Sequence, residues 1–188
     1  MPVITKEKFD LVVKDERDLK ILDRYICETN LKYLCKTILK FKDWDTVHDD
    51  LQKFDIETKQ KKFKLYLLPR GHLKTSIITI AKTIQDLLKN PDAKILITSA
   101  VWNNSRTFLY EIKEYLESKS ILPWLYGAFK SELWNSDQII IRHRKIPNKT
   151  PSIDTAGTEK PMTSQHYDII RADDLVNDSN ITNPEQIL

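Results

Sequence analysis

The chain has 188 residues, with 30 Lys and Arg against 27 Asp and Glu and a net charge of +3. Its 40% hydrophobic and 30% charged residues are typical of one globular α/β domain and exclude a disordered chain. No apolar run approaches the roughly 18–20 residues that cross a bilayer, and the amino terminus lacks a secretory signal pattern, so we expect no membrane contact and a cytosolic location. The small net charge does not by itself indicate nucleic-acid binding.

The first third of the chain is predicted to be helical. Apolar residues recur at three- and four-residue steps over residues 16–40, which favours an amphipathic helix with a break near Asn30. A second helix is predicted over residues 43–58, with Asp43 or Asp45 as its amino-terminal cap. We interpret this part as a helical lead-in to the domain.

The two cysteines, Cys27 and Cys35, lie within the first helical pattern. They have no CxxC motif and no His-rich partner segment, which makes a disulfide or zinc framework a poor interpretation. We expect both to be small core residues.

A strand–helix alternation follows the lead-in. Residues 63–68 form a short β-type run, predicted to be a buried strand, that ends at the turn signal of residues 69–71. The pattern then predicts a helix over 75–89, a buried strand over 94–99 and a helix over 103–118. Such an order implies a parallel sheet with right-handed crossovers.

The last third of the chain is predicted to be mainly strands. Residues 123–135 are aromatic and irregular, and the runs 138–142 and 152–155 are predicted to be strands that form a hairpin. A final strand over 167–172 leads directly into two adjacent carboxylates at positions 173 and 174.

The segment between the first predicted strand and its helix reads Leu68-Pro69-Arg70-Gly71-His72-Leu73-Lys74-Thr75. A phosphate-binding loop wraps backbone N–H groups around phosphate, places a lysine on the β/γ oxygens and opens a helix toward the anion. Lys74 is the candidate lysine, and Thr75 is the candidate hydroxyl ligand of Mg²⁺. Because Leu68 and Leu73 stand where the common pattern has Gly, a plain strand-to-helix turn explains this segment equally well when it is taken alone.

The acidic pair is the second candidate feature. Asp173 could hold the Mg²⁺ shell, while Asp174 could orient or deprotonate an attacking water. Adjacent carboxylates repel each other unless a cation stands opposite, although a solvated turn remains an alternative for the pair alone. The loop and the acidic strand occur in the order that a nucleotide-binding site requires. Together they support this interpretation more strongly than either feature does alone.

These residues resemble one family, the ATPase domain of the large terminase subunit, which is the packaging motor of tailed bacteriophages. The resemblance covers most of the chain, and the segments that carry it are residues 33–35, 43–45 and 48, the loop 68–75, and residues 90–91, 95–97, 157–163 and 167–174. It implies an α/β P-loop NTPase of the ASCE/RecA-like type, a three-layer sandwich with a mainly parallel central sheet. Residues 1–60 would be the helical lead-in, and residues 61–188 the ATPase core, truncated before the lid and nuclease regions.

The resemblance also implies the roles of individual residues. The nucleotide-binding set is Pro69, Arg70, Gly71, His72, Leu73, Lys74, Thr75 and Ser76. Lys74, Arg70 and Asp174 would be catalytic, with Arg70 on the phosphates, and Thr75 and Asp173 would bind the metal. Adenine recognition is expected from residues 33–44, where Tyr33 or Trp44 could stack on the base, although core packing is the more common role for either.

Two departures from the family pattern affect the details. Family members commonly have Gly just before the lysine, where this chain has Leu73. They also often have a Thr-Gly-x-Arg-like sequence before the acidic strand, where this chain has Thr163-Ser164-Gln165-His166. An arginine finger from that approach would be missing or displaced, and the candidates to replace it are Arg142, Arg144, Arg171 and Lys160. Solvated surface roles explain these cations equally well.

The predicted activity is hydrolysis of ATP with Mg²⁺ to move double-stranded DNA into a procapsid, in the host cytoplasm. The implied partners are the portal protein and the small terminase subunit, with a homo-oligomeric ring on the capsid and a monomer in isolation. A nuclease domain does not fit in this length, so an expressed fragment or a split gene is expected. Two alternatives stay open: a helicase-like nucleic-acid ATPase, and a non-catalytic nucleotide-binding module that assembles partners.

Overall fold

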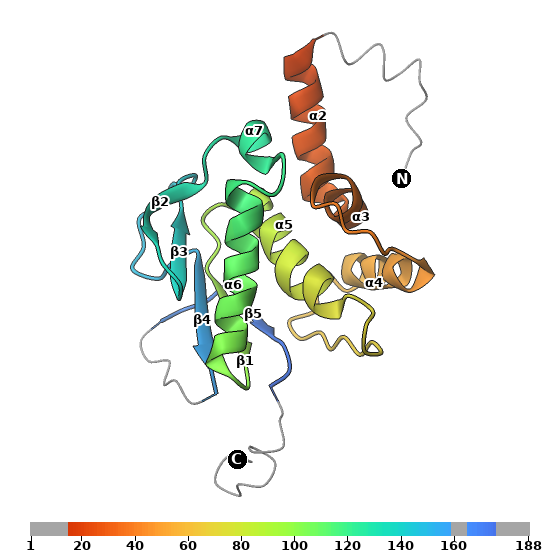
Figure 1. The fold of residues 1–188 in the computed structure, drawn as a ribbon, viewed down its shortest axis with the longest axis vertical. Helices are drawn as coiled ribbons and strands as arrows, with labels where there is room; N and C mark the ends of the chain where they lie inside the picture. The colour runs from red at the N-terminus through yellow and green to blue at the C-terminus, as the bar shows by residue number, and fades with distance from the viewer. Residues whose placement is uncertain (1–14, 159–164, 176–188) are drawn as a thin grey trace, which may run out of the picture.

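The computed structural model describes residues 15–158 and 165–175 (Figure 1). These residues form an α/β fold, in which a five-stranded sheet packs against a group of helices. In chain order the elements are α2 (Glu16–Thr29), α3 (Leu31–Tyr33), the π-helical η1 (Leu34–Ile38), α4 (Thr46–Glu57), the π-helical η2 (Thr75–Ala81), α5 (Lys82–Lys89), β1 (Ile95–Ser99), α6 (Trp102–Glu117), α7 (Leu122–Tyr126), β2 (Lys130–Trp134), β3 (Gln138–Ile141), β4 (Ile153–Gly157) and β5 (Ile169–Ala172).

The sheet is mixed, with the strand order β2-β3-β4-β1-β5. β1 runs parallel to both β4 and β5, and its residue Ile97 pairs with Thr155 on one side and Arg171 on the other. β3 pairs antiparallel with β2 and with β4. The predicted parallel arrangement is therefore confirmed for β4, β1 and β5, and the predicted pairing of the 138–142 and 152–155 runs is confirmed as β3 and β4.

One face of the sheet is covered by helices. Ile95 and Ile97 of β1 belong to the main hydrophobic cluster. The Trp102 side chain at the start of α6 donates a hydrogen bond to Thr155 Oγ1, at 3.3 Å, on this same face. The opposite face is open at β5, where Ile170 is 63% exposed. Among the described residues, no second helical layer of the expected three-layer sandwich covers this strand.

The lead-in helices end where the sequence predicts. α2 stops at Asn30, whose side chain accepts a hydrogen bond from the Tyr33 N–H and so caps the next helix, which confirms the predicted break. α4 begins after Asp45, whose carboxylate accepts the Val47 N–H at 3.0 Å. Of the two predicted caps, Asp45 is therefore the one used.

The lead-in and the sheet share one hydrophobic core. Leu34 and Ile38 of η1 lie in the same buried cluster as Ile84 of α5 and Ile97 of β1. Cys27 and Cys35 are also fully buried there as free thiols, which confirms their predicted core role. Burial raises the pKa of the Cys35 thiol to about 12, so this sulfur stays protonated and unreactive at neutral pH.

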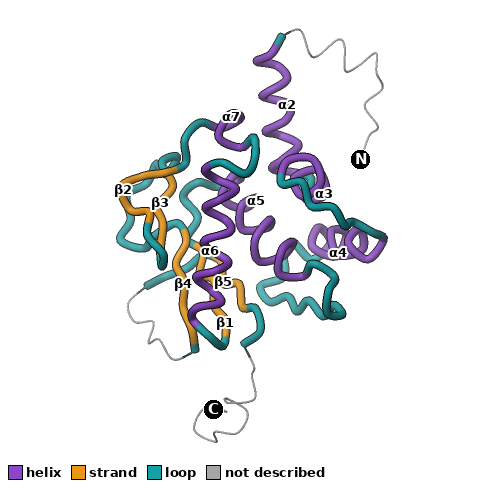
Figure 2. Tube along the Cα trace, in the orientation of Figure 1, coloured by secondary structure: helices purple, strands orange, loops and turns teal. Residues whose placement is uncertain are grey.

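Residues 63–68 differ from the prediction of a buried strand. They are extended but pair with no described strand, and Figure 2 draws them as loop. Phe63, Leu65 and Leu67 are 91%, 75% and 84% exposed, whereas the alternate side chains pack inward. The predicted buried strand is therefore wrong: the structure forms no strand here, and no described strand lies beside this segment.

The region predicted as irregular, residues 123–135, contains two regular elements. α7 has Pro123 in its first turn, a position where proline favours helix, and ends at Gly127 with φ 86°. β2 then forms the sheet edge against β3. Both elements are short, and their burial depends on contacts with α2, α6 and β3 that sequence spacing does not encode.

Candidate functional site

Lys74 meets the acidic pair at the carboxyl end of β5. Its Nζ lies 3.2 Å from Asp173 Oδ1 and 3.3 Å from Asp174 Oδ1. Lys74 immediately precedes η2, whereas the two carboxylates directly follow β5. The fold therefore brings together the two features that sequence analysis singled out separately.

The backbone around the acidic pair is anchored to β1. The Asp173 N–H donates to the Thr98 carbonyl at 2.9 Å, and the Ala100 N–H donates to the Asp174 carbonyl at 3.0 Å. Asp173 itself is 3% exposed, and its Oδ2 accepts a 3.0 Å hydrogen bond from Thr79 Oγ1. Its Oδ1 has no hydrogen-bond partner among the described groups, although it lies at ion-pair distance from Lys74.

The charges of this cluster are mutually dependent. Burial lowers the pKa of Lys74, but the close approach and negative charges of Asp173 and Asp174 outweigh burial, so the net shift of this pKa is upward. Lys74 therefore stays cationic at neutral pH. A cation between two neighbouring carboxylates offsets their repulsion, and an additional divalent cation or a polyphosphate would meet groups of both signs here.

The loop before Lys74 contains two residues with positive φ. Gly71 has φ 87°, and Leu73 has φ 51°, a left-handed value that is uncommon for leucine. Lys74 follows in the right-handed helical conformation. Alternation of left- and right-handed residues turns successive N–H groups to one side and forms a concave anion-binding nest. Leu73 thus adopts a backbone conformation that glycine adopts more readily than leucine does.

His48 of α4 holds the loop from behind. Its Nδ1 accepts the Asp45 N–H at 3.0 Å, so its Nε2 carries the proton and donates to the His72 carbonyl at 3.0 Å. The side chain of His48 is 2% exposed, and Trp44 packs on its ring with the two ring centroids 5.4 Å apart. Through this contact the lead-in helps set the path of the loop.

We expect His48→Ala to lower the free energy of unfolding by about 2–3 kcal/mol, because it removes a buried ring and leaves the His72 carbonyl without its donor. Urea unfolding followed by circular dichroism measures this change. His72→Ala is the matched control, since it keeps the carbonyl and removes a side chain that is only half-buried, and it should cost less than about 1 kcal/mol. Equal losses in the two variants would contradict the anchoring role.

The other predicted loop residues lie around Lys74 with different exposure. Pro69, Arg70 and Gly71 are exposed, so Arg70 can reach a ligand outside the loop. The half-buried members are His72, Leu73, Thr75 and Ser76. Thr75 is the first residue of η2 and thus follows Lys74 directly at the start of the helix.

The predicted arginine-finger candidates lie away from this cluster. Arg171 faces α5, where it forms an ion pair with Asp86. Arg144, which follows β3, donates to the Thr150 carbonyl at 2.7 Å and so lies near the amino end of β4. Asp173 lies at the other end of the parallel strands, after their carboxyl ends. Arg142 is exposed on that same side, and Lys160 lies outside the described residues. None of the described candidates can act on this site from within the same chain.

The predicted base-stacking aromatics are both engaged in packing. The Tyr33 hydroxyl donates to Asp23 Oδ1 at 2.7 Å, and the Trp44 indole donates to Asp49 Oδ1 at 2.9 Å. Trp44 is connected to the loop through His48, whereas Tyr33 is part of the packing around α2. A stacking role remains a prediction for Trp44, because Trp44 packs on His48, which contacts the loop directly.

Sequence reasoning missed two residues of the site. Thr79 orients Asp173, and His48 binds the loop backbone. The signal for His48 was its place three residues after Asp45, where it completes a reciprocal helix cap. Thr79 lies among apolar residues of a helix, and nothing in its local sequence indicates an acidic partner 94 residues away.

The donors at this site fit a magnesium ion shared with a phosphate. Within residues 15–158 and 165–175, no group of three or more His, Cys, Asp or Glu could hold a metal by itself. Mg²⁺ at nucleotide sites needs only one or two carboxylates, because waters and phosphates supply the other ligands. The buried Asp173 Oδ1 without a hydrogen-bond donor is a suitable oxygen for this purpose.

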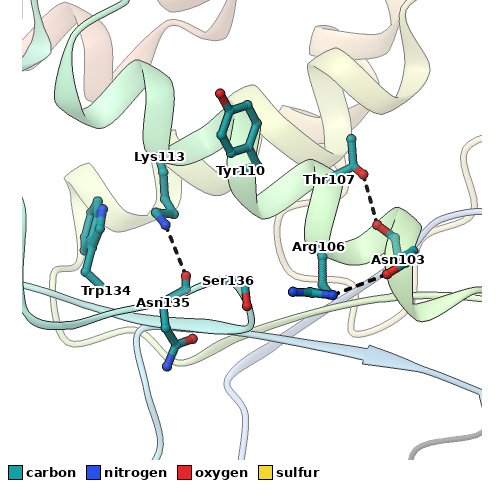
Figure 3. A pocket seen from close by; sticks show the side chains of 8 residues that line it. All are labelled: Asn103, Arg106, Thr107, Tyr110, Lys113, Trp134, Asn135 and Ser136. Atoms are coloured by element: carbon teal, nitrogen blue, oxygen red, sulfur yellow. Dashed lines mark hydrogen bonds between the residues drawn. The ribbon is translucent and has the colours of Figure 1, made fainter.

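A polar groove of about 560 Å³ lies elsewhere, between α6 and the turn that joins β2 to β3 (Figure 3). Its cations are already engaged: Arg106 Nε lies 2.9 Å from Asp137 Oδ1, and Lys113 Nζ donates to the Asn135 carbonyl at 3.2 Å. None of the predicted site residues lines it. This groove is therefore separate from the Lys74 cluster.

Comparison of the sequence with known proteins assigns no family to this chain. No protein-family model matches the chain, and no curated protein matches it as a relative. None of the helices in the described ranges combines the length and apolar character needed to cross a bilayer. The chain is an α/β protein with a mixed five-stranded sheet, and a lysine and two carboxylates meet at the carboxyl end of its parallel strands.

Proposed function

We propose that the chain is a nucleoside-triphosphatase domain of the P-loop class, with Mg²⁺ and ATP bound at the Lys74 cluster. The observation that carries this proposal is the approach of Lys74 to both Asp173 and Asp174, at 3.2 and 3.3 Å. The left-handed residues Gly71 and Leu73 support it, because they shape a loop whose N–H groups can surround phosphate.

Each group has a distinct task in the proposed site. Lys74 binds the β/γ-phosphate oxygens, which replace one of its carboxylate partners. Asp173, held by Thr79, and the hydroxyl of Thr75 hold Mg²⁺, which neutralises charge on the transferred phosphoryl group. Asp174 is 77% exposed and is free to orient a water for attack. Arg70 adds positive charge from the exposed turn.

Within this class we propose the ATPase domain of a viral terminase large subunit. Its work would be translocation of double-stranded DNA into a procapsid in the host cytoplasm, as a ring of copies together with the portal protein and the small terminase subunit. The support is the loop Pro69-Arg70-Gly71-His72-Leu73-Lys74-Thr75 followed by the acidic strand, on an α/β fold. The ASCE/RecA-like three-layer arrangement belongs to this proposal.

A direct test is calorimetric titration of the purified chain with a non-hydrolysable ATP analogue, with and without Mg²⁺. Binding at micromolar to millimolar concentration that is strengthened by Mg²⁺ is the expected result, and the loop and acidic-pair amides should shift in the NMR spectrum. Absence of binding at millimolar nucleotide would overturn the proposal.

A second candidate is a non-catalytic nucleotide-binding module. It is favoured by the position of Arg171 and Arg144, since neither can neutralise a transferred phosphoryl group from within the chain. Rates of hydrolysis separate the two candidates: a motor with a finger from a neighbouring subunit gains turnover on assembly, whereas the module binds ATP and gains none. A helicase-like ATPase would use the same site and is distinguished by its nucleic-acid substrate.

A further inference from the structure

A second groove, of about 740 Å³, lies between β5 and the extended segment before the loop. One wall is residues 168–172, the other wall comes from residues 59–66, and the floor is formed by η2 and α5. Lys74, Asp173 and Asp174 do not line the groove, although Thr79, which donates to Asp173, is part of its floor.

The β5 wall presents an unpaired strand edge. β5 is the last strand of the sheet among the described residues, and its only neighbour there is β1. The Ile169 and Asp173 N–H groups point to β1, where they donate to carbonyls at 3.2 and 2.9 Å. Because the direction of these groups alternates along a strand, the N–H and C=O groups of Ile170 and Ala172 point into the groove. An exposed row of such groups is a template for another strand.

The opposite wall, residues 59–66, is a loop that belongs to no described strand. Lys64 Nζ and the Tyr66 hydroxyl both contact Asp55 Oδ1, at 2.8 and 2.9 Å, which fixes this segment against α4. Leu65, which lies between them, is 75% exposed. Since no described strand pairs with this segment, both walls have backbone groups that a strand between them could satisfy.

The excess of positive charge in the groove favours an acidic ligand. Seven of its lining residues are cationic and four are acidic. Asp55 and Asp86 pair with Lys64, Lys82 and Arg171, so they do not neutralise the other four lysines of the lining. Lys82 and Lys89 both line the floor, and burial, together with the neighbouring charge of Lys82, lowers the pKa of Lys89 to about 8. An incoming carboxylate would offset these neighbouring positive charges.

We propose that the groove binds an extended strand of a partner polypeptide, with acidic side chains toward the floor and apolar side chains on the open face of the sheet. Side chains alternate between the two faces of a strand, so a partner of alternating acidic and apolar residues fits both requirements. On the open face it would lie beside Ile170 and the apolar side chains of the extended segment, and it would reduce their exposure. This binding does not depend on the proposed ATP site.

The test uses the full chain and a synthetic peptide in which Glu and Val alternate, with a Lys–Val peptide of equal length as the probe control. Two-dimensional NMR at millimolar peptide should show shifts along 168–172 and 59–66 for the Glu–Val peptide, and slowed amide exchange at Ile170 and Ala172. The Lys–Val peptide should bind at least about tenfold more weakly, because it meets the lysines of the groove.

Two variants of one residue identify the strand edge. Ile170→Pro removes the N–H that points into the groove but no bond to β1, and an edge position tolerates proline. It should weaken Glu–Val peptide binding by about tenfold or more, whereas Ile170→Thr keeps the N–H and should change binding by less than about threefold. Circular dichroism and binding of Mg·ATP verify that both variants are folded.

Several outcomes would overturn the proposal. One is the absence of shifts with the Glu–Val peptide, and another is equal binding by the two Ile170 variants. Slow exchange of the Ile170 and Ala172 amides in the free chain would mean that the chain itself fills the groove. Tighter binding of an oligonucleotide than of the Glu–Val peptide, insensitive to Ile170→Pro, would assign the lysines to nucleic acid instead.

Discussion

Replacing Lys74 with alanine is expected to lower ATP hydrolysis by about 10²–10³-fold, the range found when one preorganised charge-stabilising group is removed from an active site. The reason is that its Nζ, between Asp173 and Asp174, is the only described cation at ion-pair distance from both. Without it the phosphate loses its cation and meets two carboxylates. Steady-state release of phosphate at saturating Mg·ATP measures the change.

Lys94→Ala is the matched control for Lys74→Ala. Lys94 also pairs with a carboxylate of the β5 region, at 3.2 Å from Asp168, but at the opposite end of the strand. Its loss should leave turnover within about twofold of the native rate, since surface pairs contribute little. Lys74→Arg keeps the charge and the fold while changing the head-group geometry, and its turnover should also fall. Native turnover in Lys74→Ala would exclude the proposed site.

Asp173→Asn is expected to remove the magnesium dependence of ATP binding and to lower turnover by about 10²-fold or more. The amide keeps the shape and an acceptor for the Thr79 hydroxyl, so the local packing should persist. It cannot supply the anionic oxygen that Mg²⁺ requires at Oδ1. Calorimetric titration with ATP at several Mg²⁺ concentrations measures the binding, and phosphate release measures the turnover.

Asp168→Asn provides the comparison for Asp173→Asn. Asp168 lies just before β5, and its Oδ2 accepts the Lys94 N–H at 3.0 Å, so this variant changes a carboxylate on the same strand without touching the cluster. Its Mg²⁺ dependence should equal that of the native chain. If both variants lose magnesium dependence together, the effect belongs to the strand and not to a metal ligand.

The main parts of the candidate site were predictable from the sequence because each has a local signature. A lysine and a hydroxyl residue at the start of an amphipathic helix, after a turn signal, indicate the loop. Two carboxylates at the end of an apolar run indicate the strand end. Their order along the chain favoured a shared site, and the distances from Lys74 to Asp173 and Asp174 agree with that prediction. No strand precedes the loop in the described structure, so this contact arises without the predicted first strand.

The supporting contacts and the sheet edges were not predictable in the same way. His48 and Thr79 act across 24 and 94 residues, and their partners are defined only when the chain is folded. The apolar run 63–68 has the composition of a buried strand, yet Leu67 is 84% exposed. Strand propensity describes a residue that fits a pleated surface, whereas burial depends on which neighbours are present.

Local patterns along the chain were sufficient to predict the α/β class, most helix and strand positions, the break at Asn30 and the two halves of the candidate site, because periodicity and capping act over a few residues. The strand order, the unpaired edge of β5, the placement of Arg171 against Asp86 and the contact of Lys74 with the acidic pair became apparent only in the folded chain. These features depend on contacts between distant segments, whose energies arise from packing and charge in three dimensions and leave no periodic trace along the chain.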